Sequence, residues 1–221
     1  PLRDSQTSLT GFVDKLSMIP LRFDPGTNWC YSLATDVCGA LVEIISGQSF
    51  SEFLGERIFE PLDMSDTSFT ISDEKVQRLA ANYERDQDKN LVLVDDPVES
   101  IYADTRRLQS GGGGLLSTTA DYAKFCEMLL GGGKYNGCRI IGDRTLKMMC
   151  QNHLPMNADL ASVAMGSFSE TAYEGVGFGL GFASTLSEVK AHILGEGDFY
   201  WGGMASTIFW VDPRERMFCV F

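Results

Sequence analysis

The sequence predicts an α+β fold in which a helical region precedes an antiparallel sheet. Apolar residues recur at helical spacing in several stretches of residues 1–175, whereas residues 176–221 are rich in aromatic and β-branched runs. Consecutive helices followed by consecutive strands differ from the alternation that builds a parallel doubly wound sheet. The chain has 221 residues, of which 44% are hydrophobic, so it can bury a sizeable core. We therefore predict one domain over residues 1–221.

The first two predicted helices follow one another closely. Residues 37–45 place apolar side chains at helical spacing, and Gly47 supplies a C-terminal cap. Ser49 and Glu52 form a capping-box pattern at the start of the second helix. Pro61 ends that helix because proline cannot continue the backbone hydrogen bonding.

Two further helices and a long irregular segment complete the helical region. One helix runs from Thr118 or Thr119 to Leu130, and the other begins near Asp143. Residues 82–114 show little periodicity, which predicts a long loop that is either a solvated surface excursion or part of a site. The four glycines that close this segment lack the Lys-Ser/Thr ending of a phosphate loop, so nucleotide binding is not indicated.

The last quarter of the chain predicts strands. Apolar and aromatic runs occupy residues 178–182, 199–201, 207–211 and 217–221. Residues 212–215, Asp-Pro-Arg-Glu, are typical of a turn between the last two strands. We therefore expect an antiparallel sheet over residues 176–221.

The charge and hydropathy of the chain exclude several function classes. The net charge is −12, from 30 acidic and 18 basic residues, and such a surface repels phosphate backbones and anionic lipid headgroups. Nucleic acid is therefore excluded as a partner. No apolar stretch approaches the roughly 20 residues that a membrane helix needs, so no membrane span is expected.

The cysteines and histidines indicate no metal and no cofactor. The six cysteines are scattered, and a chain of this size does not need disulfides, so buried free thiols are favoured over a disulfide framework. The two histidines stand in no zinc-binding pattern. The compartment is not fixed by the sequence, with the cytoplasm favoured for a soluble protein of this kind.

Two distant motifs carry most of the functional information: Tyr31-Ser32-Leu33 ahead of a predicted helix, and Trp201-Gly202-Gly203 ahead of a predicted hairpin. They stand among longer ordered stretches, which are Phe23-x-Pro-Gly-x-x-Trp-x-Tyr31-Ser32 and residues 36–43, 57–69, 111–122 and 209–213. In this order the stretches resemble the class C β-lactamase-like serine hydrolases. Among these they are most similar to the family VIII carboxylesterases. The resemblance spans nearly the whole chain and implies a β-lactamase/transpeptidase-like fold.

The resemblance implies a role for each motif. Tyr31 matches the general base or proton shuttle of the family, and since a phenol has a pKa of about 10, it needs a lysine ammonium beside it. Gly202 and Gly203 would let a substrate approach the strand edge, and Met204 would offer its backbone N–H to the oxyanion. The alternative for Tyr31 and Trp201 is packing alone, at a helix start and in the core.

Two departures from the β-lactamase pattern indicate the substrate class. Leu33 stands where a β-lactamase has asparagine, which removes a hydrogen-bonding partner for a lactam side chain. The Trp201 motif replaces Lys-Thr-Gly, so an apolar ring stands where a cation would pair with the lactam carboxylate. Both changes favour a neutral ester. We therefore expect a carboxylesterase that acts on small esters or amides through an acyl-enzyme intermediate.

In the family the nucleophile lies in a Ser-x-x-Lys element upstream of the tyrosine motif. Ser72 and Ser187 each have a lysine three residues later, but both follow Tyr31, the first in a charged stretch and the second between predicted strands. We expect neither to be catalytic. Because Pro1 does not resemble a natural start and Phe221 lies within an apolar run, we expect the central and C-terminal part of a longer protein, incomplete at both ends.

Three hypotheses follow. The chain is part of a serine hydrolase, or it is a catalytically silent scaffold or binding protein of the same fold, or it is a structural domain with accidental motifs. A large separation between Tyr31 and Trp201 in space would support the third. Within the enzyme class, a β-lactamase or D-amino-acid peptidase is the alternative to the esterase. Uncovered sheet edges would also predict association or poor solubility.

Overall fold

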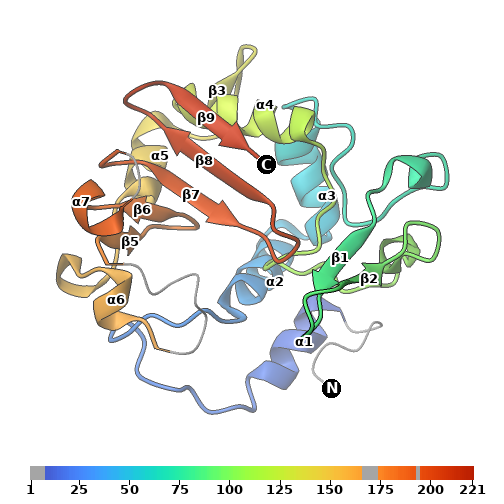
Figure 1. The fold of residues 1–221 in the computed structure, drawn as a ribbon, viewed down its shortest axis with the longest axis horizontal. Coiled ribbons are helices and arrows are strands. Elements are labelled where there is room, and N and C mark those ends of the chain that lie inside the picture. The colour runs from blue at the N-terminus through green and yellow to red at the C-terminus, as the bar shows by residue number, and fades with distance from the viewer. Residues whose placement is uncertain (1–7, 166–173, 193–194) are drawn as a thin grey trace.

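The computed structural model describes residues 8–165, 174–192 and 195–221 (Figure 1). Its helices are α1 (Leu9–Leu16), α2 (Ala34–Ser46), α3 (Phe50–Leu54), α4 (Thr119–Leu130), α5 (Asp143–Cys150), α6 (Leu160–Val163) and α7 (Glu188–Ala191). Its strands are β1 (Asn82–Arg85), β2 (Leu91–Asp95), β3 (Lys134–Tyr135), β4 (Cys138–Arg139), β5 (Val176–Phe178), β6 (Ala183–Thr185), β7 (Phe199–Gly202), β8 (Ile208–Asp212) and β9 (Met217–Val220). A π-helical turn, Gly55–Phe59, extends α3.

Local sequence signals explain where the predicted helices begin and end. Gly47 caps α2 with φ of 71°, a left-handed conformation that glycine adopts without strain. Ser49 and Glu52 form the predicted capping box at the start of α3. Thr118 caps α4 by accepting a hydrogen bond from the Asp121 N–H. The four helix predictions are confirmed, and α1 lies outside them.

The last quarter of the chain forms an antiparallel sheet of five strands in the order β5-β6-β7-β8-β9. The predicted turn joins β8 to β9, and Asp212 Oδ1 accepts hydrogen bonds of 2.8 Å from the Arg214 and Glu215 N–H groups. The strands predicted at 199–201, 207–211 and 217–221 are confirmed.

The strand predicted over residues 178–182 is wrong. Phe178 ends β5 and Ala183 begins β6, so the four residues between them form the turn that joins these strands. Gly181 adopts φ of 105° in this turn, a conformation that side-chain-bearing residues avoid. The two glycines of the segment, which have no side chains to pack, favour a turn over a continuous strand.

The loop predicted over residues 82–114 is wrong in its first part, where a β-hairpin lies. β1 and β2 pair antiparallel, with Tyr83 opposite Leu93. Tyr83 and the four apolar residues 91–94 of β2 are all exposed. Because apolar side chains stand on both faces of β2, the sequence lacks the alternation that marks a half-buried strand.

The main core lies between the sheet and the helices α4 and α5. Figure 1 shows α4 beside β8 and β9, and both strands contact this helix. The buried side chains of this core include Cys126, Leu129, Leu146, Phe199, Phe209 and Val211. On the other face of β8 and β9, the side chains of Ile208, Met217 and Phe221 are exposed. Among the described residues, none of the helices combines the length and apolar character that a membrane crossing requires.

The six cysteines, all within the described residues, carry free thiols. Cys126 is buried, whereas Cys38 and Cys219 are exposed, so the expectation that the thiols are buried is wrong for these two. Burial raises the pKa of Cys126 and of Cys150 to about 12. These two thiols are therefore protonated at neutral pH and are unsuited to act as nucleophiles.

Candidate active site

The two sequence motifs meet in space. The rings of Tyr31, from the segment that precedes α2, and Trp201, from β7, are stacked with centroids 5.9 Å apart and an interplanar angle of 15°. Tyr31 is 42% exposed and Trp201 is half-buried, so the pair forms part of an open surface. A large separation between the two rings would have supported a structural domain with accidental motifs. The observed contact gives that hypothesis no such support.

Two further aromatic residues close a ring of contacts around this pair. The Trp29 ring lies 6.3 Å from that of Tyr31 and 5.1 Å from that of Phe178, centroid to centroid. Phe178 in turn meets Trp201 edge to face at 5.2 Å. We call Trp29, Tyr31, Phe178 and Trp201 the aromatic cluster. Tilted and edge-to-face contacts at these separations are favourable for aromatic side chains.

Trp29 and Phe178 are not among the site residues predicted from the sequence. Trp29 belongs to the Trp-x-Tyr31 part of the stretch that carries the resemblance, so a signal for it was present. Phe178 is the first residue of the segment 178–182, which is predicted as a strand but is a turn after Phe178. No local pattern indicates that the end of β5 lies against a segment from the first sixth of the chain.

The start of α2 fixes the segment that carries Tyr31. Ser32 Oγ accepts a hydrogen bond of 3.2 Å from the Ala34 N–H, and the half-buried Leu33 stands at the N-cap position. Asp36, in the first turn, is 1% exposed and accepts a hydrogen bond from the Ser110 hydroxyl. The end of the 82–114 segment is thereby attached to the turn that follows Tyr31.

The second motif forms the turn between β7 and β8. Gly202 ends β7, the Gly203 N–H donates to the Thr207 carbonyl at 2.7 Å, and the Ser206 N–H donates to the Gly203 carbonyl at 3.0 Å. A Cβ on Gly203 would overlap the Thr207 hydroxyl unless that side chain rotated away. The Met204 side chain is fully exposed. Within the described residues its backbone N–H donates to no protein acceptor.

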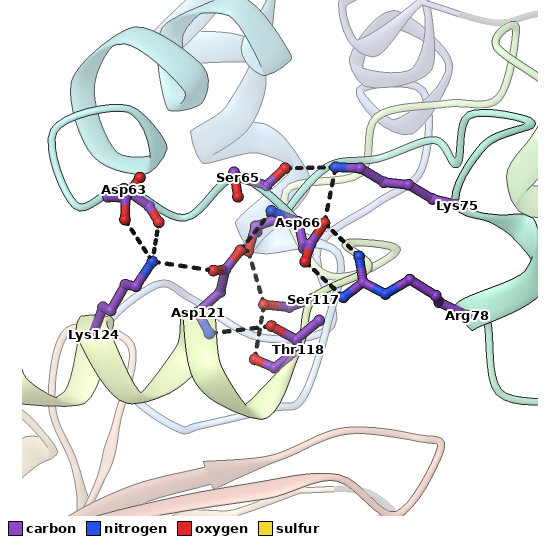
Figure 2. A network of polar contacts seen from close by, with 10 residues as sticks. Asp63, Ser65, Asp66, Lys75, Arg78, Ser117, Thr118, Asp121 and Lys124 are labelled. Atoms are coloured by element: carbon purple, nitrogen blue, oxygen red, sulfur yellow. Dashed lines mark hydrogen bonds and ion pairs between the residues drawn. The ribbon is translucent and has the colours of Figure 1, made fainter.

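The two Ser-x-x-Lys strings lie in different surroundings. Lys75 Nζ is 2.9 Å from Asp66 Oδ1 and donates to the Ser65 carbonyl at 2.7 Å (Figure 2). Ser72 is exposed and its carbonyl accepts a hydrogen bond from the Lys75 N–H. Ser187 stands at the N-cap position of the short helix α7, between β6 and β7, and its side chain makes no capping hydrogen bond.

Lys75 belongs to a polar network that attaches the segment after α3 to α4 (Figure 2). Asp121, 4% exposed, accepts from the Asp66 N–H at 2.7 Å and from the Thr67 hydroxyl at 3.0 Å. Asp66 in turn pairs with Arg78, and hydrogen bonds from Arg78 and Lys75 hold the pKa of Asp66 well below its usual range. The network accounts for Lys75 as a structural residue.

A titratable group with a raised pKa lies just before β7. Asp198 is 1% exposed; Trp210 Nε1 donates to its Oδ2 at 2.7 Å, and its Oδ1 has no hydrogen-bond partner in the part of the chain that the structure describes. Burial raises the pKa of Asp198 to about 6; the Trp210 hydrogen bond opposes the rise, and the charges of Asp212 and Glu188 add to it. Among the described residues, no group of three or more His, Cys, Asp or Glu is arranged to hold a metal ion.

The family model described as Beta-lactamase matches residues 2–221. The chain is 30% identical over 93% of its length to Protein Rv1367c of Mycobacterium tuberculosis, covering 51% of that protein. It is 29% identical over 94% of its length to the lovastatin esterase of Penicillium rubens, covering 53% of it. The chain thus spans about half the length of the curated relatives it matches.

Solved structures with the same fold confirm the predicted fold class. EstCE1, described as a hydrolase with promiscuous acyltransferase activity, superposes with a TM-score of 0.80 at 26% identity, over 99% of this chain and 57% of that one. Simvastatin synthase from Aspergillus terreus has a TM-score of 0.75 at 23% identity, over 99% of this chain and 57% of that one.

Proposed function

The chain belongs to the β-lactamase family, and on that premise we propose that it supplies part of a serine carboxylesterase site that cleaves small esters through an acyl-enzyme intermediate. The observation that carries the proposal is the stacked contact of Tyr31 and Trp201. Most of the chain separates these residues in sequence, so their contact is a property of the fold. If two distant segments line one site, their motif residues are expected to lie in contact.

In the proposed reaction a serine hydroxyl attacks the ester carbonyl carbon while its proton passes to the deprotonated oxygen of Tyr31. The tetrahedral intermediate collapses to an acyl-enzyme, and Tyr31 returns the proton to the departing alkoxide, which leaves as the alcohol. Water then attacks the acyl-enzyme by the same route and releases the acid. The Met204 N–H is proposed to donate to the oxyanion, for which it is free of any protein acceptor among the described residues.

The nucleophilic serine and the lysine that would favour the Tyr31 phenolate are proposed to lie outside these 221 residues. Two observations support this. Lys75 is engaged with Asp66 and Ser65, so the Ser72 string does not present a lysine to a nucleophile. The chain also spans about half of its curated relatives, which leaves room for a further segment in a protein of their length.

The substrate class is inferred from the uncharged side chains at the site. Leu33 and Trp201 offer no cation and no amide, and the aromatic cluster is apolar apart from the phenol and the indole N–H groups. A neutral ester loses less on entering such a site than an anionic lactam, which would leave its carboxylate without a partner. One relative is named an esterase and EstCE1 is described as a hydrolase, which supports the same class.

Two alternatives to the esterase stand beside this proposal. A relative in Escherichia coli that is 23% identical over 93% of this chain is called a putative D-alanyl-D-alanine carboxypeptidase, which favours a peptidase within the same family. A catalytically silent scaffold is favoured if no Ser-x-x-Lys element accompanies the Tyr31 motif in the whole protein.

The proposal is tested by hydrolysis of a short-chain p-nitrophenyl ester. Hydrolysis is measured on this chain and on an extended protein that also includes the sequence that the gene encodes upstream. We expect no turnover and no adduct with a phosphonate active-site probe on the chain alone, read by intact mass. The extended protein should turn over the ester and lose at least 100-fold of its kcat/KM on Tyr31→Phe, since removal of a proton-transfer group costs about 10²–10⁴-fold. Tyr83→Phe, on the exposed β1–β2 hairpin, is the matched control and should keep the parent activity.

An adduct on Ser72 or Ser187 together with Tyr31-dependent turnover by the chain alone would show that the nucleophile lies within these residues. Absence of turnover by the extended protein, with its fold intact, would favour the silent scaffold. Faster cleavage of a D-alanyl-D-alanine peptide than of the ester would favour the peptidase.

A further inference from the structure

We propose that Trp29 is a positioning residue that holds the Tyr31 ring against Trp201, and that Phe178 completes the support from the sheet. The catalytic meaning of this inference rests on the proposed function. The contacts on which it depends, however, are features of the fold and can be tested without a substrate.

Trp29 is the member of the aromatic cluster with the firmest backbone anchorage outside the sheet. Its N–H donates to the Val163 carbonyl at 3.0 Å, and its carbonyl accepts from the Met165 N–H at 2.8 Å. These two bonds form an isolated parallel bridge to the segment that follows α6. These bonds fix the backbone of Trp29, and the ring contacts with Tyr31 and Phe178 define where the indole lies.

The contacts of the cluster connect this anchor to Tyr31 by two routes. Directly, the Trp29 and Tyr31 rings lie 6.3 Å apart at an interplanar angle of 53°. Indirectly, Trp29 meets Phe178 at 5.1 Å, and Phe178 meets Trp201 at 82°, which supports the ring on which Tyr31 stacks. Each of the four rings thus touches two others, and removal of one leaves a chain of contacts in place of a closed circuit.

Tyr31 needs such support because of where it stands. It lies in the segment before α2, and 42% of it is exposed. A proton-transfer group must be held within a fraction of an ångström of its working position for full effect. The aromatic cluster restricts the Tyr31 ring while part of the residue stays exposed.

A purely structural role for Trp29 is the competing explanation, because the cluster also packs on a second buried core that includes Leu154, Leu160 and Val176. A variant that only weakened this core would lower the unfolding midpoint but leave the environment of Tyr31 unchanged in the folded state. The test therefore reads the Tyr31 environment directly.

The experiment compares near-ultraviolet circular dichroism spectra with and without Tyr31. In each background the spectrum of the Tyr31→Phe variant is subtracted from that of its parent, which isolates the signal that depends on the Tyr31 phenol. The backgrounds are the unaltered chain, Trp29→Ala, Trp29→Phe, Phe178→Leu and Trp210→Phe. Trp210 is the matched control, because it is the third of the three tryptophans and lies outside the cluster.

We expect Trp29→Ala to lose at least half of the Tyr31-dependent signal, Phe178→Leu to lose a smaller part, and both Trp29→Phe and Trp210→Phe to retain most of it. An unchanged signal in Trp29→Ala with a parent-like far-ultraviolet spectrum would overturn the proposal, as would an equal loss in Trp210→Phe. If Trp29→Ala does not fold, the other two variants decide the test. An unchanged Tyr31-dependent signal in Phe178→Leu, together with complete loss of that signal in Trp29→Phe, would overturn the proposal.

The extended protein gives a second readout. There, Trp29→Ala should lower kcat about tenfold or more with little change in KM, and Trp29→Phe should restore most of the loss. A Trp29-dependent signal in a protein that proves inactive would overturn the proposed function alone. Full activity of Trp29→Ala would overturn the positioning role alone.

Discussion

The carboxyl group of Asp198 has two oxygens in different surroundings. Oδ2 accepts the Trp210 indole N–H, whereas Oδ1 is buried without a hydrogen-bond partner within the described residues. An ionised carboxylate in this position has too few donors to replace the water it loses, so its protonated form is favoured. Asp198 therefore costs the fold stability at neutral pH, which is a consequence of burial at the start of β7.

The raised pKa of Asp198 makes the stability of the fold depend on pH. Because the pKa of Asp198 is raised in the fold to about 6, the folded chain holds a proton between about pH 4 and 6 that the unfolded chain has released. The stability from this proton is present below pH 4 and lost as the pH rises through 6. Asp198→Asn keeps an acceptor for Trp210 without the charge. We expect it to gain about 1–3 kcal/mol over the parent between pH 5 and pH 8, measured by urea denaturation.

Trp210→Phe provides the control for this prediction. It removes the hydrogen bond that opposes the rise in the pKa of Asp198, so its stability should go on falling to a higher pH than that of the parent. Parallel pH profiles for the parent and Asp198→Asn would contradict the assignment.

At the same scale, the sequence predicted Tyr31 and Trp201 as neighbours but not the residues that support them. The motif resemblance located the pair because both stand in ordered stretches that can be recognised locally. Phe178 and Asp198 acquire their surroundings from the pairing of β5, β6, β7 and β8, and no local pattern encodes which side chains the register brings together.

At the scale of elements, Gly111 lets the backbone of the 110–114 segment approach the backbone of α2 closely. A Cβ on Gly111 would overlap the Thr35 carbonyl oxygen and lie close to Asp36. The Asp36 carboxylate accepts the hydrogen bond from the Ser110 hydroxyl. No such obstacle surrounds Gly113, whose added Cβ would meet nothing within 4 Å. Neither glycine has a positive φ, so the difference between them is one of packing.

This contrast gives a prediction with a matched control. Gly111→Ala should lower the free energy of unfolding by about 1–3 kcal/mol, as overpacking of a tight contact does. Gly113→Ala should remain within about 0.5 kcal/mol of the parent. Both are measured by thermal and urea denaturation. Equal effects of the two substitutions would mean that the segment moves away from α2 without cost.

The same scale shows the limits of sequence patterns for elements. Caps and periodicity located α2, α3, α4 and α5, because these signals act within a few residues. The β1–β2 hairpin is not predicted because its apolar residues are exposed on both faces. The β5–β6 turn is predicted as a strand because aromatic residues are typical of strands. In both cases burial, which is a property of the whole fold, decides the outcome.

At the scale of the whole molecule, the helical region and the sheet were predicted from the change in pattern along the chain, and the family fold confirms both. The sheet is covered by α4 and α5 on one face, whereas Ile208, Met217 and Phe221 are exposed on the other. β9 is also an edge strand of the five. Exposed apolar side chains beside an open strand edge favour association.

We therefore expect the chain on its own to self-associate, measured by sedimentation velocity over a range of concentrations. Met217→Lys places a charge on the exposed face and should weaken association at least tenfold. Met156→Lys is the control, because Met156 is 96% exposed but lies on the turn before α6. A monomeric parent would remove the basis for this expectation.

The aromatic cluster has a consequence for how the molecule folds. Its rings come from both ends of the described chain, so the stack of Tyr31 on Trp201 closes a loop that contains nearly every helix and strand. Contacts that close long loops lose the most chain entropy and tend to form late. The cluster should thus be absent from early folding intermediates. The stack of Tyr31 on Trp201 should alter tryptophan emission, and this change would show that the chain has reached its final topology.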